Sequence, residues 1–183
     1  MLRRLIYQAA GLGMVAFCAS TANAVPIEFG ITGGSATAYG FAEGTNVSIQ
    51  TNDELISTFT LDVGSSKTVK FLDISVSGKG IAAGFIDASL QFGSPVVGDA
   101  SGLLVGLAVI LDSLGSGGVT PIDHPGLISF GDGGLFGISF NGFTKSCFAC
   151  TALSGTVTAT ISLLKAPTRV PEPGRIMRIR ALM

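Results

Sequence analysis

The stretch Thr156-Val157-Thr158-Ala159-Thr160-Ile161-Ser162-Leu163 alternates a small polar residue with an apolar one at every step. Successive side chains of a β-strand point to opposite faces of a sheet, so this alternation predicts a strand with one buried face and one solvated face. Threonine is β-branched and favours extended backbone, which strengthens the prediction. The stretch therefore favours a β-rich fold with hydroxyl groups on one surface.

The same alternation recurs elsewhere in the chain. Further apolar stripes are formed by Phe136, Ile138 and Phe140, by Leu55, Phe59, Leu61 and Val63 with Ser57 as a polar exception, and by Ile86, Ala88, Leu90 and Phe92. Between Thr68 and Ser77 the alternation changes phase, since Phe71 and Leu72 are both apolar. One extra residue in the strand, a β-bulge near Phe71-Leu72, would absorb this change.

Glycine-containing turns are expected between these runs, because glycine adopts positive φ at little cost. The expected turns are Gly33-Gly34, Glu43-Gly44, Gly64-Ser65, Gly78-Lys79-Gly80, Gly93-Ser94-Pro95, Gly115-Ser116-Gly117-Gly118 and Gly131-Asp132-Gly133-Gly134. The pattern predicts an all-β chain of about nine or ten strands with no helix in the mature protein, packed as an antiparallel β-sandwich. Without a fixed repeat period, a β-solenoid is the second choice.

The composition is apolar, rich in glycine and poor in charge. Charged residues make up 13% of the chain, and 26 of its 183 residues are glycine. From Val25 to Val170 there are six basic and eleven acidic residues, a net charge of −5, which argues against a nucleic-acid partner. The longest apolar run after the N-terminal region, Leu103 to Leu111, is interrupted by Gly106 and too short to span a membrane, so it is interpreted as a buried strand.

The N-terminus has the pattern of an export signal. Arg3 and Arg4 precede an apolar stretch from Leu5 to Ala19, and Ala22-Asn23-Ala24 provides the small residues that signal peptidase accepts. Residues 1–24 are therefore predicted to be a signal peptide, cleaved after Ala24. One β-sandwich domain over residues 25–164 is expected next, followed by a linker and tail over residues 165–183.

Near the C-terminus, Val170-Pro171-Glu172-Pro173 resembles the opening of the PEP-CTERM sorting signal of Gram-negative bacteria. In that family, the Pro-Glu-Pro box precedes an apolar membrane-spanning stretch and a cluster of arginines, and an exosortase is thought to process the signal. Here Gly174 is followed by nine residues that include Arg175, Arg178 and Arg180 but no spanning stretch, so the anchor is interpreted as truncated or degenerate. A frameshift or premature stop is one hypothesis for this departure.

The resemblance implies an exported protein of the cell surface or the extracellular matrix, associated with exopolysaccharide and biofilm. It implies an exosortase-type sorting enzyme as partner if the tail is functional, with exopolysaccharide as a second possible partner. Without a spanning helix in the mature chain, we expect soluble protein in the periplasm or outside the cell.

Cys147-Phe148-Ala149-Cys150 is the most distinctive local motif of the predicted domain. An exported protein meets an oxidising compartment, so the two cysteines are expected to form a local disulfide that fastens a hairpin. A thioredoxin-like redox motif would require a surrounding βαβ pattern, which is missing from the sequence. A zinc site would need two more ligands, and His124 alone cannot complete the set.

No group of residues predicts an enzyme. His124 stands between prolines beside Asp123 and is interpreted as a loop residue, since no G-x-S-x-G nucleophile motif accompanies it. The acidic residues are scattered, and whether two of them converge as a glycosidase pair cannot be read from the sequence. Asp99-Ala100-Ser101-Gly102 and Gly131-Asp132-Gly133-Gly134 offer oxygen ligands, but ordinary turns explain them more simply than calcium, so no metal or cofactor is predicted.

The leading functional hypothesis is an exported, non-enzymatic surface or matrix protein. The alternative is a β-sandwich that binds or cleaves carbohydrate and acts on exopolysaccharide. Aromatic platforms are typical of carbohydrate-binding modules, and this chain has no tryptophan and only Tyr7 and Tyr39 as tyrosines, although phenylalanine can substitute in part.

Overall fold

The computed structural model describes residues 25–41, 45–111, 114–123 and 125–168. These residues form eleven strands: β1 (Ile27–Tyr39), β2 (Thr45–Thr51), β3 (Ser57–Leu61), β4 (Ser66–Gly78), β5 (Gly80–Ser94), β6 (Gly98–Ile110), β7 (Leu114–Pro121), β8 (Gly126–Phe130), β9 (Gly134–Asn141), β10 (Phe143–Phe148) and β11 (Ala152–Lys165). No helix occurs in the described ranges, so none of them contains a helix able to cross a membrane. The predicted all-β class is confirmed, with slightly more strands than the nine or ten expected.

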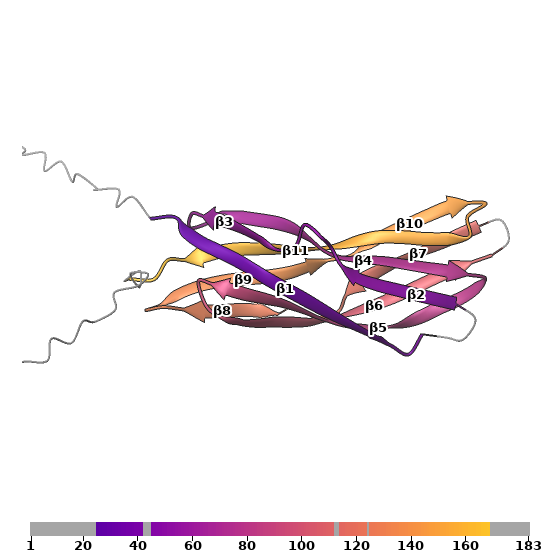
Figure 1. Ribbon diagram of the computed structural model, residues 1–183, viewed down its shortest axis with the longest axis horizontal. Helices are drawn as coiled ribbons and strands as arrows, with labels where there is room; N and C mark the ends of the chain where they lie inside the picture. Colours follow the sequence, from indigo (N-terminus) through magenta and orange to yellow (C-terminus); the bar gives the residue numbers. More distant parts are fainter. Residues whose placement is uncertain (1–24, 42–44, 112–113, 124, 169–183) are drawn as a thin grey trace, which may run out of the picture.

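The strands form two curled antiparallel sheets that pack face to face as a sandwich (Figure 1). Sheet A has the strand order β10-β7-β6-β5-β1-β3, and sheet B has the order β2-β4-β11-β9-β8. The chain changes sheet at each connection from β1 to β5, and again between β7 and β8, between β9 and β10, and between β10 and β11. Each sheet therefore presents one face to the core and one face to solvent.

The core is filled by the inward side chains of both sheets, with phenylalanine at its centre. Phe71 of β4 stacks on Phe140 of β9 with ring centroids 5.0 Å apart. Phe29 of β1 and Phe136 of β9 form a T-shaped pair with ring centroids 5.2 Å apart. A smaller cluster that includes Val76, Ile110 and Leu153 lies apart from this main cluster. Burial of this apolar surface is the main favourable contribution to folding.

The residue pattern identified most of the inward face. The apolar residues of 157–163, 136–140 and 86–92 are all buried, on β11, β9 and β5. The expected bulge also occurs, because Leu72 pairs with Val157 while Lys70 pairs with Thr158, which leaves Phe71 as the extra residue. In the remaining stripe, Leu55 and Leu61 are buried, but Val63 lies beyond the end of β3 with 44% of its surface exposed.

Two of the expected glycine turns are wrong, because Gly33-Gly34 lies within β1 and Gly115 to Gly118 lies within β7. A Cβ on Gly34 would come within 2.8 Å of the Phe71 ring, and one on Gly117 within 2.8 Å of the Ala108 backbone. These glycines therefore permit close packing inside the sandwich and do not reverse the chain. Gly64 and Gly133 lie in turns, and Gly78 ends β4 just before the chain reverses into β5; all three have positive φ, as the pattern predicted.

The prediction of a buried strand for Leu103 to Leu111 also needs correction. Residues 103–110 form the second half of β6, where Leu104 and Ile110 are buried but Leu107 is 55% exposed; Leu111, just beyond β6, is 58% exposed. Both faces of β6 are apolar here, so one apolar row faces the core and the other faces solvent. The residues are consecutively apolar because both faces of the strand carry apolar side chains, not because both faces are buried.

Both ends of the domain lie at the same end of the sandwich (Figure 1). Ile27 at the start of β1 pairs with Leu61, and the turn after Leu61 places the Gly64 amide 2.8 Å from the carbonyl of Leu163 near the end of β11. Beyond β11, Pro167 is buried and the Thr168 amide donates to the carbonyl of Asp132 at 2.9 Å. The first part of the expected linker therefore contacts the β8–β9 turn.

Candidate functional site

The outer face of sheet B carries small polar side chains almost throughout, and we call it the hydroxyl face. Its members are Ser48, Gln50, Ser66, Thr68, Lys70, Asp73, Ser75, Ser139, Asn141, Ser154, Thr156, Thr158, Thr160 and Ser162. Each is exposed or half-buried. The β11 half of this set is the polar row from which the fold was predicted.

Strand register arranges these side chains in rows across the sheet. Gln50 of β2 is opposite Asp73 of β4, which in turn is opposite Thr156 of β11. The neighbouring row joins Ser48, Ser75 and Ser154 in the same way. Strands lie about 4.8 Å apart, and outward positions along a strand recur about every 6.8 Å, so the face is a regular array of donors and acceptors.

A groove lies over β2, β4 and β11, with a volume of about 410 Å³. It is lined by Ser48, Gln50, Asp73, Ile74, Ser75, Lys145, Ser154, Gly155 and Thr156. Lys145 enters from β10, and its ammonium group donates to the carbonyl of Ser154 at 3.1 Å. The groove thus combines hydroxyl, amide, carboxylate and ammonium groups in one open depression.

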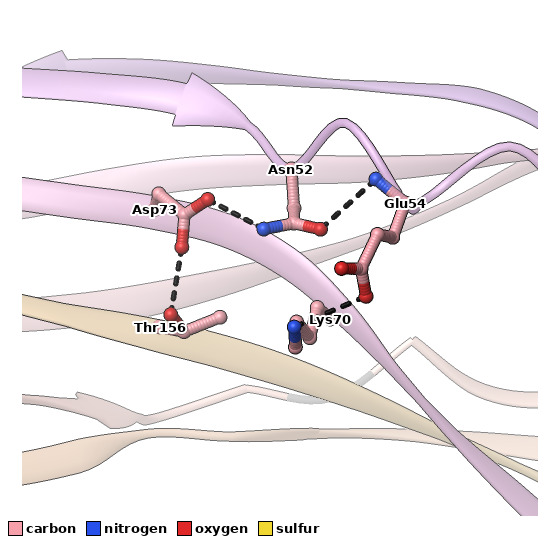
Figure 2. Close-up of polar contacts among 5 residues, drawn as sticks. All are labelled: Asn52, Glu54, Lys70, Asp73 and Thr156. Atoms are coloured by element: carbon pink, nitrogen blue, oxygen red, sulfur yellow. Dashed lines mark hydrogen bonds and ion pairs between the residues drawn. The ribbon is translucent and has the colours of Figure 1, made fainter.

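Asp73 is the most strongly held side chain in the groove (Figure 2). The Thr156 hydroxyl donates to its Oδ1 at 2.7 Å, and the Asn52 amide donates to its Oδ2 at 2.6 Å. Asn52 also accepts a hydrogen bond from the amide of Glu54, whose carboxylate lies 3.0 Å from the Lys70 ammonium group. The network fixes the carboxylate from β4, β11 and the β2–β3 loop.

These contacts lower the pKa of Asp73 below its usual value. The hydrogen bond from Thr156 is the main cause, followed by the hydrogen bond from Asn52 and then the charge of Lys70, while partial burial acts in the opposite direction. All three causes favour the ionised form. The groove therefore contains a fixed negative charge at neutral pH, and the ammonium group of Lys145 also lines it.

A second polar contact orders the middle of the hydroxyl face. The Thr160 hydroxyl lies 2.9 Å from the hydroxyl of Thr68, and it accepts a hydrogen bond from the Asn141 amide at 2.9 Å. Three adjacent strands, β4, β11 and β9, are joined in this way. The side chains of the array are thus held partly in place before any ligand arrives.

Cys147 and Cys150 are joined by a disulfide, with Cα atoms 6.0 Å apart. Cys147 lies in β10 and Cys150 in the turn before β11, where Ala149 has a positive φ of 53°. Both sulfur atoms pack over Gly115 of β7, which leaves no room there for a side chain. The expected hairpin is wrong, because β10 pairs with β7 in sheet A while β11 pairs with β4 and β9 in sheet B. The disulfide instead fastens the connection between the two sheets, at the end of the sandwich opposite the chain ends (Figure 1).

Several residues singled out in the sequence lie outside the described ranges. These are the cleavage residues Ala22 and Ala24, the motif Val170, Pro171, Glu172 and Pro173, and His124. Asp99 to Gly102 lies within β6, and Asp132 lies in the β8–β9 turn. In the ranges that the structure covers, no three His, Cys, Asp or Glu side chains gather as a metal site.

No family model, curated protein or solved structure matches this chain. The functional argument therefore depends on the geometry of the groove. Sequence reasoning predicted the polar row of β11 but did not identify Gln50 or the network around Asp73. The alternation of Asn46, Ser48 and Gln50 with apolar residues was the available signal.

Proposed function

We propose that this protein is an exported, non-enzymatic protein of the cell surface or extracellular matrix that binds exopolysaccharide through the groove of its hydroxyl face. The observation that carries the proposal is the groove, where Gln50, Asp73 and Thr156 stand side by side on three strands. A polysaccharide presents many hydroxyl groups, each of which can both donate and accept a hydrogen bond. An array of fixed hydroxyl, amide and carboxylate groups offers matching partners.

The size and openness of the groove suit part of a long polymer. Its volume of about 410 Å³ falls within the range of about 300–1,000 Å³ that is usual for ligand sites. The groove is open, so a chain could enter and leave without a free end. Asp73 has both oxygens occupied by protein donors and serves in this proposal as a fixed acceptor.

The two terminal motifs support the export part of the proposal. A signal peptide over residues 1–24 would deliver the domain across the inner membrane, and the Val170 to Pro173 motif would present it to an exosortase-type enzyme. The Cys147–Cys150 disulfide is in keeping with an oxidising compartment.

The test is binding of the full chain to exopolysaccharide purified from the host, followed by a glycan array. Gln50→Ala removes an exposed amide from the groove and should weaken binding by about tenfold, as expected for loss of one or two hydrogen bonds. Gln91→Ala is the matched control, because Gln91 is an exposed glutamine on the outer face of sheet A. Equal weakening by both variants, or no saturable binding by the parent, would overturn the proposal.

A hydrolase screen on the same glycans separates binding from cleavage. We expect no release of reducing ends by the parent protein. Turnover that disappears in Asp73→Asn would replace the non-enzymatic proposal with the carbohydrate-cleaving alternative.

A further inference from the structure

The outer face of sheet A differs sharply from the hydroxyl face, and we call its solvent-facing half near the disulfide the apolar face. Its apolar members are Tyr39, Ile81, Ala83, Phe85, Leu103, Val105, Leu107, Val109, Leu114 and Phe148. Ile81 is 58% exposed, Leu107 55% and Phe148 80%. A contiguous exposed apolar surface of this kind marks an interaction site.

Strand register shows that the apolar face is continuous. Ile81 is opposite Val109, and Phe85 is opposite both Val105 and Tyr39, whose ring stacks on Phe85 with centroids 5.7 Å apart. The outward positions on β7 and β10 that complete these rows are small and neutral: Ser116, Gly118, Thr120, Thr144 and Ser146. None of these positions is charged, and the next outward residue of β5 after Phe85 is Asp87.

The surface has both a ridge and a groove. A depression of about 490 Å³ lies over β6 and β7, lined by Val105, Leu107, Val109, Thr144 and the segment 116–120 apart from Val119. Exposed Ile81 and Phe85 project from neighbouring β5. In a two-fold arrangement, the β5 ridge of each copy would lie against the β6–β7 groove of the other, which makes the surface self-complementary.

We propose that the apolar face binds a second copy of this chain, so that two molecules form a two-fold dimer by packing sheet A against sheet A. Five strands at about 4.8 Å and about eight residues at 3.4 Å give a face of roughly 19 Å by 27 Å. Two such faces would bury on the order of 1,000 Å² in total, the level at which specific interfaces begin. Face-to-face sheets pack about 10 Å apart, as in the sandwich itself.

The charge of the body favours a second copy over a lipid membrane as the occupant. Surfaces that bind anionic membranes are bordered by lysine and arginine, but residues 25–170 have a net charge of −5. Two copies would repel each other weakly, because salt at physiological strength screens charges beyond about 8 Å. Raising the salt concentration should therefore tighten the dimer.

The test is sedimentation of the full chain over a range of concentrations. We expect a monomer–dimer equilibrium for the parent and a dissociation constant raised by at least tenfold in Leu107→Glu, which places a charge at the centre of the face. Leu127→Glu is the matched control, since Leu127 is 65% exposed on β8 of the other sheet and should leave the equilibrium unchanged. Circular dichroism checks that each variant is folded.

If Leu107→Glu fails to fold, Ile81→Lys provides the same comparison from β5. A parent protein that stays monomeric at about 100 µM, or a dimer unaffected by either charged variant, would overturn the proposal. Vesicles of neutral phosphatidylcholine and of anionic phosphatidylglycerol form a separate arm. Binding of a monomer to either kind of vesicle, lost in Leu107→Glu, would assign the face to a membrane.

Discussion

At the scale of single residues, Asp73 is a partly exposed carboxylate that hydrogen bonds from two other segments hold in place. Its two oxygens accept hydrogen bonds from Thr156 and Asn52, which come from strand and loop segments far apart in the sequence. Each bond stabilises the charged form more than the neutral form, so the pKa of the carboxyl group falls. The same contacts hold the Asp73 carboxylate in the groove, and they make part of the stability of the folded protein dependent on pH.

Asp73→Asn should lower the free energy of unfolding by about 1 kcal/mol at pH 7, a value discounted because the carboxylate is partly exposed. The folded-state pKa lies below the unfolded value, so this contribution is complete above the unfolded pKa of 3.8 and is lost as pH falls through the folded pKa. Urea unfolding between pH 2 and pH 7 measures the difference between parent and variant. A difference that stays constant over this range would contradict the assignment, and Thr156→Val should reproduce part of the effect.

Gly155 tests the packing between β11 and β10. A Cβ at this position would overlap the ring of Phe143, so Gly155→Ala should destabilise the fold by about 2 kcal/mol through overpacking. Gly137→Ala is the control, since its Cβ would meet the flexible end of Leu127 at 3.4 Å and should change stability by less than about 0.5 kcal/mol. Chemical denaturation of the pair measures both values, and equal effects would show that the Phe143 ring moves aside.

At the scale of strands, the sequence predicted elements wherever one face alone was apolar. The stripes at 86–92 of β5, 136–140 of β9 and 156–163 of β11 were identified because large apolar residues occupy every second position there. The turns predicted at Gly34 and Gly117 were wrong. At these positions glycine is needed because residues of other strands pack too close for a Cβ atom. Such an approach depends on tertiary packing, which local sequence does not record.

The β10–β11 connection between the sheets should depend on its disulfide. Closing a loop of four residues reduces the entropy of the unfolded chain enough to contribute about 2 kcal/mol. Replacing Cys147 and Cys150 together by serine should therefore lower the melting temperature by about 4–8 °C. Thermal unfolding with and without a reducing agent measures this, and the doubly substituted protein is the control that should not respond to the reductant. A parent that is insensitive to reduction would contradict the prediction.

At the scale of the whole molecule, the two outer faces have opposite character. Sheet B presents hydroxyl and amide groups, while half of sheet A presents leucine, isoleucine and phenylalanine. The alternation of polar and apolar residues predicted the polar rows of single strands. It did not predict which rows lie next to each other on the outer face of a sheet. The order of strands in each sheet decides which polar rows become neighbours, and residues such as Gln50 and Thr156 meet only through β4.

Export of the chain is a prediction for the intact protein in its cell. We expect the mature chain to begin at Val25 and to appear in the periplasmic or extracellular fraction, because Ala22-Asn23-Ala24 matches the small-residue pattern that signal peptidase accepts. N-terminal sequencing after fractionation tests this, and Ala24→Arg should leave the leader uncleaved. Recovery of an intact leader in the cytosol would contradict it.

The shared position of the two chain ends gives the sandwich a polarity along its length. β5 has 15 residues, so the disulfide in the β10–β11 connection lies about 50 Å from the end where β1 starts and β11 stops. If the protein were attached to a support through either chain end, the disulfide-linked β10–β11 connection would lie at the end of the molecule farthest from that support. Molecules attached to the same support could then contact one another near their disulfide ends. The distance of that contact from the support would depend more on the length of the strands than on the length of the linker.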